Sequence, residues 1–515
     1  MTVEGLEKVS SQSGGGTAAP QIRGSTLLVT GRLIAVGLNF AAQVSLARYL
    51  GTDDYGLFFY ALSFVAFWQA FATLGFKRAI SRFVPIYDEK GEIEKLFGTI
   101  LLSGGVVIAT GLTIIGTFYL APGLFSHFLI QGDRAVVLLS ILVFLVPVEG
   151  LDLLLVHLFA AFGEPRAIFF RKYVLGPGLK LLVVLLLISL GTSVKFLAWG
   201  YLLASVAGLT LYLWVLLGIF RRRGLFQSCR LRTLRIPVRE VLSFTLPVLT
   251  SDLLTVVMNP VSVLLLGYFH DASEVARFRV VLPAARFNTL VMSSLGMLYT
   301  PAAARLFARK DTRGINSLYW NTAAWTAVLS FPIFAMTFCM ASPLTTFLYG
   351  ARYESSATIL ALLALGYYFN ASLGFNGVTL KVLGKVRYTV AIDLLTLATN
   401  AAANMILIYR YGALGAALGT AGTMVFHNIL KQAGLGLVSG LHVLDWKYVS
   451  FYLTIGGGVL ALVAVQFFAP RNVYLGATFV LLTALFVLAA GRKKLDIGQT
   501  FPALLRIPVL RFFLA

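Results

Sequence analysis

Apolar residues along this chain occur in long runs, separated by short segments that carry most of the charged residues. A helix needs roughly 20 apolar residues to cross a bilayer. Fourteen runs approach this length, and we predict a spanning helix in each: 25–46, 56–76, 96–119, 136–160, 173–190, 196–219, 241–267, 278–300, 316–338, 355–379, 389–408, 413–436, 448–468 and 474–490. The pattern predicts an all-α polytopic membrane protein of about 14 transmembrane helices.

Composition supports this interpretation. Hydrophobic residues make up 58% of the 515 residues and charged residues only 12%, whereas soluble domains contain about 25% charged residues. The mean hydropathy is +0.85. A chain this apolar could not cover its own surface in water, so a soluble enzyme is excluded and lipid is the expected solvent.

The net charge of +21 is distributed unevenly between alternate connecting segments. With the N-terminus in the cytoplasm, the cytoplasmic segments hold 30 Lys and Arg residues and the opposite ones hold 6. Because basic residues concentrate on the cytoplasmic side, we expect both termini in the cytoplasm and the protein in the cytoplasmic membrane. The charge is a topology signal, and no nucleic-acid partner is expected.

The domain organisation follows from the same pattern. The predicted parts are a cytoplasmic tail (1–24), an N-terminal six-helix lobe (25–220), a basic cytoplasmic linker (221–240), a C-terminal six-helix lobe (241–437), two additional transmembrane helices (438–490) and a second cytoplasmic tail (491–515). The linker could bind a partner or anionic lipids, but a simple positive-inside connection is the better interpretation.

The two lobes resemble each other weakly. Residues 46–56, at the junction of the first two spans, have a counterpart in residues 264–271, and the Phe83-Val84-Pro85 segment has one in Tyr299-Thr300-Pro301. Because each lobe has an even number of spans, the repeats share one orientation. Such parallel repeats are related by an axis along the membrane normal and hold the substrate between them.

Basic residues inside spans are the main candidates for substrate binding, since charges in lipid are costly and mark functional sites. Arg32 and Arg286 occupy matching regions of the two lobes and would form a cationic cleft. Arginine binds phosphate oxygens in bidentate geometry, so an anionic headgroup such as a pyrophosphate would fit. Lys180, Arg277 and Arg279 could extend this path; alternatively, each basic residue snorkels or pairs with an acid.

Four acids also lie within spans: Glu149, Asp152, Asp252 and Asp393. We favour a counter-charge role for them over binding of a coupling cation, because no two have convincing ligand spacing. Glu149 and Asp152 share one helical face, which leaves an ion site open. Since the sequence contains no nucleotide-binding, nucleophile or metal-ligand motif, we expect no catalytic residues, cofactor or metal, and energy from a gradient or from supply and removal of the substrate.

Several segments, in this order along the chain, resemble the polysaccharide exporter and flippase branch of the multidrug/oligosaccharidyl-lipid/polysaccharide (MOP) superfamily: residues 47–58, 75–83, 266–269 leading to 299–301, 349–353 before 384–387, and 411–420. The resemblance covers nearly the whole chain. It implies alternating access and movement of an undecaprenyl- or dolichyl-pyrophosphate-linked oligosaccharide across the cytoplasmic membrane, as in O-antigen-type flippases. One departure is Asn259, where family members often have an acid, with Asp252 two turns earlier.

The expected partners are the lipid-linked oligosaccharide, membrane lipids, and a glycan polymerase or glycosyltransferases, with a monomer as the functional unit.

Two alternatives to the flippase function remain. A cation-coupled multidrug exporter of the same fold would need acids in the first-lobe cavity, whereas the first span offers Arg32. A membrane scaffold for glycan assembly would tolerate charge reversal at Arg32 and Arg286.

Overall fold

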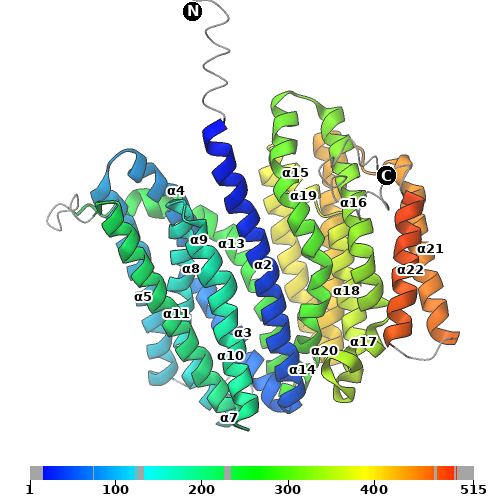
Figure 1. Cartoon of the computed structure of the whole chain (residues 1–515), viewed down its shortest axis with the longest axis horizontal. Coiled ribbons are helices and arrows are strands. Elements are labelled where there is room, and N and C mark those ends of the chain that lie inside the picture. Colours follow the sequence, from blue (N-terminus) through cyan, green and yellow to red (C-terminus); the bar gives the residue numbers. More distant parts are fainter. Residues whose placement is uncertain are drawn as a thin grey trace, which may run out of the picture. The chain divides into compact units, whose positions relative to one another are not determined.

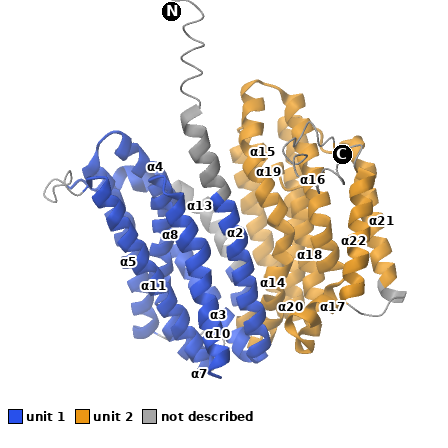
Figure 2. Cartoon of the chain, in the orientation of Figure 1, with its two compact units in different colours: residues 1–264 blue, residues 265–515 orange. Residues whose placement is uncertain are grey.

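The computed structural model describes residues 15–73, 75–121, 123, 133–225, 234–468, 473–491 and 495; the side chains of residues 15–26, 246–259 and 466–468 also lie outside the description. Helices joined by short turns fill these ranges, with no strand among them (Figure 1). The chain divides into two compact units, residues 1–264 and 265–515 (Figure 2). The boundaries predicted from the sequence, with a linker at 221–240, stay a prediction.

Unit 1 is a helical bundle whose apolar core includes Phe76, Phe159 and Tyr212. Its aromatic and aliphatic side chains pack around α8, which contacts α3, α4, α5 and α11. The helices are α2 (Gly15–Tyr49), α3 (Thr52–Thr73), α4 (Phe76–Glu89), α5 (Ile93–Leu120), α7 (Asp133–Leu142), α8 (Leu145–Ala161), α9 (Pro165–Ile168), the π-helix η1 (Phe169–Leu175), α10 (Gly176–Ser189) and α11 (Val194–Arg222), followed by α13 (Val238–Phe269), which runs past the unit boundary.

Two segments of unit 1 differ from the sequence-based expectation. Residues 77–95 were expected to form a loop, but most of them form the amphipathic α4, which begins after Gly75 in a left-handed conformation (φ 75°). The predicted span 136–160 consists of α7 and α8, separated by a turn at Val143 and Phe144 shortly before Pro147. Hydropathy averages over a window, so it does not register a local break within an apolar run.

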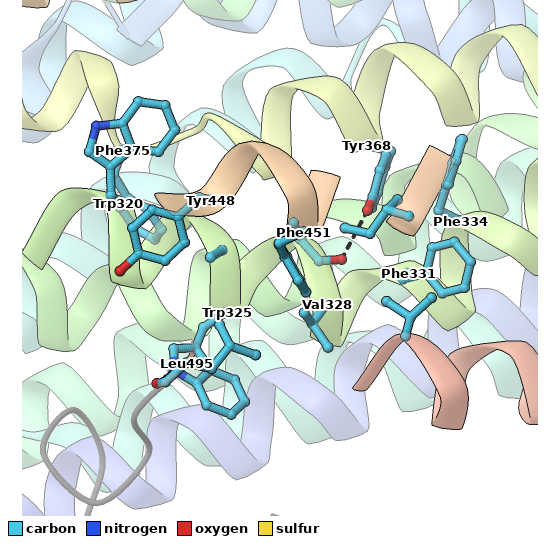
Figure 3. Packing of buried hydrophobic residues seen from close by; sticks show 14 of the residues in the cluster. Trp320, Trp325, Val328, Phe331, Phe334, Tyr368, Phe375, Tyr448, Phe451 and Leu495 are labelled. Carbon is cyan, nitrogen blue, oxygen red and sulfur yellow. Dashed lines mark hydrogen bonds between the residues drawn. The ribbon is translucent and has the colours of Figure 1, made fainter. Parts of the chain in front are cut away.

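Unit 2 is a second bundle with a core rich in tryptophan and tyrosine (Figure 3). Phe334 and Tyr368 stack with ring centroids 4.1 Å apart, and the Tyr368 hydroxyl donates to the Ala327 carbonyl at 3.0 Å. The elements are α14 (Ala272–Arg286), the 3₁₀-helix η3 (Phe287–Thr289), α15 (Leu290–Ala308), α16 (Thr312–Phe338), α17 (Ala341–Tyr349), the 3₁₀-helix η4 (Ala351–Ser356), α18 (Ala357–Ser372), α19 (Asn376–Val382), α20 (Val386–Ser439), α21 (Trp446–Phe468) and α22 (Val473–Gly491).

The continuous element α20 is in fact a hairpin of two antiparallel limbs. Its chain reverses at Gly412, where φ is 55° and ψ is −132°. The Tyr388 hydroxyl on the first limb donates to the Leu430 carbonyl on the second at 3.0 Å. At the turn, the Ala413 amide donates to Glu274 Oε2 at 2.7 Å. The sequence-based ranges 389–408 and 413–436 correspond to these two limbs.

Among the described residues, eleven helices are long and apolar enough to cross a membrane, or twelve if α16 and α17, bent by 74°, form one span. This count treats α20 as one helix. Each of the predicted ranges overlaps a helix of the structure. The chain is an all-helical, multi-pass membrane protein, and the number of fourteen spans stays a prediction.

Candidate functional site

A polar cavity of about 270 Å³ lies within unit 1, among helices that are otherwise apolar. Its wall combines charged side chains with amides and a hydroxyl. Helices α8, η1 and α10 supply all five charged groups, and α2, α3 and α11 supply the three remaining polar ones. The lining residues are Asn39, Gln69, Val148, Glu149, Asp152, Leu153, Val156, Arg171, Lys172, Gly176, Pro177, Lys180, Ala204 and Ser205.

Both carboxylates of this cavity face a basic side chain. Lys180 Nζ lies 3.3 Å from Glu149 Oε1, and Arg171 Nη2 donates to Asp152 Oδ1 at 2.8 Å. Glu149 and Asp152 are three residues apart on α8, so they lie on the same face of the helix. The two ion pairs compensate for charges that would otherwise be costly to enclose in the bundle.

Arg171 is the more enclosed cation, with only 8% of its surface exposed. Its guanidinium carbon lies 5.1 Å from the centre of the Tyr212 ring. It occupies space left by two glycines: a Cβ on Gly208 would lie 2.0 Å from Nη2, and one on Gly176 would lie 2.5 Å from Nη1. Arg171 is therefore held on several sides by contacts that no larger residue at 176 or 208 would allow.

Arg171 and Lys172 belong to η1, a π-helical segment. Such segments are rare and occur frequently at functional sites. Lys172 is exposed and lines the cavity, and no carboxylate pairs with it among the described residues. With three cations and two carboxylates, the cavity has an excess of one positive charge.

Arg32 lies on α2, on the side of unit 1 where α2 packs against η1 and α10. The neighbouring Gly31 allows this packing, because a Cβ there would lie 2.6 Å from the Phe169 ring. The Arg32 side chain is exposed, and its charge acts on Lys172. Three of the residues singled out from the sequence, Lys180, Glu149 and Asp152, thus line one cavity, and Arg32 lies near it.

The remaining basic candidates lie in unit 2 and have other partners than the cavity residues. Arg286 is exposed, and its Nε donates to the Tyr367 hydroxyl at 3.2 Å. Arg277 forms an ion pair with Glu274 at 2.6 Å, and Arg279 is half-buried. Since Arg32 and Arg286 belong to different units, their meeting in one cleft stays a prediction.

Among the acids, Asp393 lies between the two limbs of α20. Its Oδ1 is 2.8 Å from His427 Nε2 and 3.1 Å from Lys431 Nζ. The side chains of Asp252 and Asn259 lie outside the described residues. Within the described ranges, no three His, Cys, Asp or Glu side chains gather closely enough to hold a metal ion.

Arg171 and Lys172 are the charged cavity residues that the sequence analysis missed. The predicted fifth span began at residue 173, which placed both in a cytoplasmic loop. In the structure the helical segment runs from Pro165 to Ser189, so both residues belong to a helix and the expectation of a loop was wrong. The available signal was the apolar stretch that resumes on both sides of the pair, together with the unpartnered acids of the preceding span.

The family was identified by comparison with protein-family models. The model described as "Polysaccharide biosynthesis protein" matches residues 22–306, more than half of the chain. The chain belongs to the polysaccharide biosynthesis protein family. A second model, MatE, matches residues 247–409. Together these matches place the polysaccharide biosynthesis protein in the exporter and flippase branch of the MOP superfamily, as the sequence resemblance indicated, and make it a membrane transporter.

Individual relatives have low sequence identity to this chain but match most of its length. An uncharacterized membrane protein of Methanocaldococcus jannaschii is 19% identical over 415 residues, which are 78% of this chain and 80% of the relative. A lipid II flippase MurJ, in an inward closed conformation, superposes with a TM-score of 0.70 at 15% identity, over 91% of this chain and 99% of that one. An inward-facing multidrug resistance MATE transporter reaches 0.62 at 16% identity, over 84% and 98%. At these identities the two structures establish a shared fold.

Proposed function

We propose that this polysaccharide biosynthesis protein is a flippase that moves a polyprenyl-(pyro)phosphate-linked oligosaccharide across the cytoplasmic membrane. The observation that carries the proposal is the cavity of unit 1, which has three basic side chains against two paired carboxylates. An excess positive charge at membrane depth is costly unless a ligand or water compensates for it. A phosphate-containing headgroup supplies the compensating charge.

The proposed mechanism is alternating access between two lobes of a fourteen-span protein, with both termini in the cytoplasm. Arg32 and Arg286 would face a shared cleft, and the cavity of unit 1 would form its first-lobe wall. The family match and the weak internal repeat support two lobes with the same orientation. A glycan polymerase or glycosyltransferases would supply or consume the lipid-linked substrate, and the transporter would act as a monomer.

A cation-coupled multidrug exporter is the second candidate, and two observations favour it. The MatE model matches residues 247–409, and Glu149 and Asp152 place two carboxylates at the cavity. Cationic drugs would need these acids to be available. Their pairing with Lys180 and Arg171 favours an anionic substrate instead.

The test is translocation in proteoliposomes of a fluorescent pyrophosphate-linked oligosaccharide, measured as its loss from the leaflet that a membrane-impermeant quencher can reach. Wild type is compared with the double variant Arg32→Ala, Arg286→Ala. The double variant Arg309→Ala, Arg313→Ala serves as control, because both arginines are exposed at the connection between α15 and α16, outside the predicted spans.

We expect wild type and control to flip the lipid and the Arg32, Arg286 variant to lose most of this activity. Extrusion of cationic dyes without lipid flipping would replace the flippase with the drug exporter. If neither substrate moves, and charge reversal at Arg32 and Arg286 leaves glycan assembly in cells unchanged, the scaffold interpretation would be favoured.

A further inference from the structure

Two adjacent basic residues of η1 have different surroundings. Arg171 is buried between its neighbours, whereas the next residue, Lys172, is exposed at the cavity. The same cavity contains a second lysine, Lys180, from the following helix α10. The sequence of η1 and α10 thus provides three cations, and the structure gives them unequal access to a ligand.

The π-helical geometry explains how the two lysines reach the same cavity. An α-helix turns by about 100° per residue, so two residues eight apart are separated by roughly 80° around the axis. A π-turn accommodates one additional residue, and η1 ends between the two lysines, so their angular separation is smaller than in a regular α-helix. In a regular α-helix, Lys172 and Lys180 would point in clearly different directions.

Arg171 is not available for a ligand. It donates to Asp152 at 2.8 Å, lies over the Tyr212 ring and fills the space beside Gly208 and Gly176. Withdrawing the guanidinium would leave the carboxylate of Asp152 without its partner in a low-dielectric region, which is strongly unfavourable.

Lys172 and Lys180 are more available than Arg171 to bind an anionic ligand. Lys172 has no carboxylate partner among the described residues, and the pair between Lys180 and Glu149 is longer, at 3.3 Å. Both members of that pair are about one-third exposed, at 32% and 29%. An ammonium group is a compact charge on a flexible stem and can turn from a carboxylate to a phosphate with little rearrangement.

We propose that Lys172 and Lys180 form a clamp for the diphosphate of the substrate headgroup, and that Arg171 with Asp152 is a positioning pair that holds η1 in the π conformation. This proposal rests on the proposed function and deepens it, since it assigns the groups that contact the anion. Arg171 acts through Lys172 and does not touch the substrate.

The clamp is tested by titrating the detergent-solubilised full chain with inorganic pyrophosphate in a calorimeter. The variants are Lys172→Gln and Lys180→Gln, with Lys195→Gln as control, because Lys195 is an exposed lysine at the start of α11. Each clamp variant should weaken binding by about tenfold or more, the loss typical of a hydrogen bond to a charged group. The control should bind like wild type.

The positioning role is tested by a double-mutant cycle between Arg171→Gln and Lys172→Gln. A positioning residue predicts that Arg171→Gln weakens pyrophosphate binding in the wild-type background and adds little once Lys172 is replaced. Additive losses would make Arg171 itself a ligand and overturn its assignment. The conservative variant Arg171→Lys should recover part of the lost affinity, and size-exclusion chromatography verifies that each variant is folded.

The clamp and the function can fail separately. If wild type flips the lipid-linked oligosaccharide but both lysine variants bind pyrophosphate as wild type does, the clamp is wrong and the flippase stands. If wild type binds no pyrophosphate, the clamp is also wrong. If pyrophosphate binds through the lysines but no lipid is flipped, the anion site stands and the proposed function fails.

Discussion

At the residue scale, the cavity of unit 1 requires that one enclosed arginine be accommodated among apolar helices. Arg171 is tolerated because Asp152 compensates for its charge, Tyr212 covers one of its faces and two glycines leave room for its guanidinium. None of these contacts is strong by itself in water. Where water is scarce, these contacts together decide whether the guanidinium can stay charged inside the bundle.

Gly208→Ala tests this packing. The new Cβ would lie 2.0 Å from Arg171 Nη2, so the guanidinium or the helices must shift. We expect a loss of stability of about 1–3 kcal/mol, as for other overpacked cores. The measurement is thermal unfolding of the purified protein in detergent.

Gly218→Ala, on the same helix α11, is the matched control, because a Cβ there has no atom within 4 Å. It should unfold at or slightly above the wild-type temperature, since alanine favours helix. Equal melting temperatures for the two variants would show that Arg171 is not confined as described.

The acids of the cavity could be found from the sequence, because Glu149 and Asp152 stand out in an apolar span. Their partners could be found only in part. Lys180 was recognised in the same way, but Arg171 sits at the edge of an apolar run, where hydropathy assigns it to a loop. The π-turn that brings Arg171 to Asp152 depends on tertiary packing, and the periodicity of the sequence does not predict this turn.

At the scale of elements, glycine and short breaks set the architecture more than hydropathy does. The apolar runs identify where helices lie, but not that α7 and α8 are separated by a turn, or that residues 77–95 continue as α4. These breaks arise where local backbone geometry and packing override the average polarity of a window. The reversal within α20 was predicted, because the sequence becomes less apolar around residues 409–412.

Gly412→Ala tests the reversal of α20. With φ at 55° and ψ at −132°, residue 412 has a backbone conformation that side-chain-bearing residues avoid, at a cost of about 1–3 kcal/mol. A Cβ would also lie 2.5 Å from Glu274 Oε2, where the Ala413 amide is bound. We expect a clear decrease in the denaturation midpoint measured by intrinsic fluorescence.

Gly422→Ala on the second limb of α20 is the control, since a Cβ there meets no atom within 4 Å and its φ is not positive. It should be neutral or slightly stabilising. A Gly412 variant as stable as this control would contradict the hairpin.

At the scale of the whole molecule, the chain is a multi-pass transporter with a charged cavity in one unit, and we predict that its basic residues are sorted by membrane side. The orientation can be tested with single cysteines in a background where Cys229 and Cys339 are replaced by serine. Arg410→Cys, beside the α20 reversal, should react with an impermeant maleimide in intact cells. Arg387→Cys, at the start of the first limb, and Lys447→Cys, at the start of the following helix α21, should react only after permeabilisation.

Labelling of all three cysteines from the same side would contradict both the hairpin and the predicted fourteen-span topology. The opposite pattern, with only Arg410→Cys protected, would keep the hairpin and invert the orientation of the protein. All three positions are exposed in the structure, so poor reactivity would report on the membrane and not on burial.

We propose that the transporter recognises the anionic headgroup of a lipid-linked glycan. The most direct measurement compares, in proteoliposomes containing wild-type protein, the flipping rates of one oligosaccharide carried on a polyprenyl pyrophosphate and on an uncharged polyprenyl ether. We expect protein-dependent flipping of the pyrophosphate-linked form and little of the uncharged form. Equal rates for both lipids, or protein-dependent movement of neither, would contradict it.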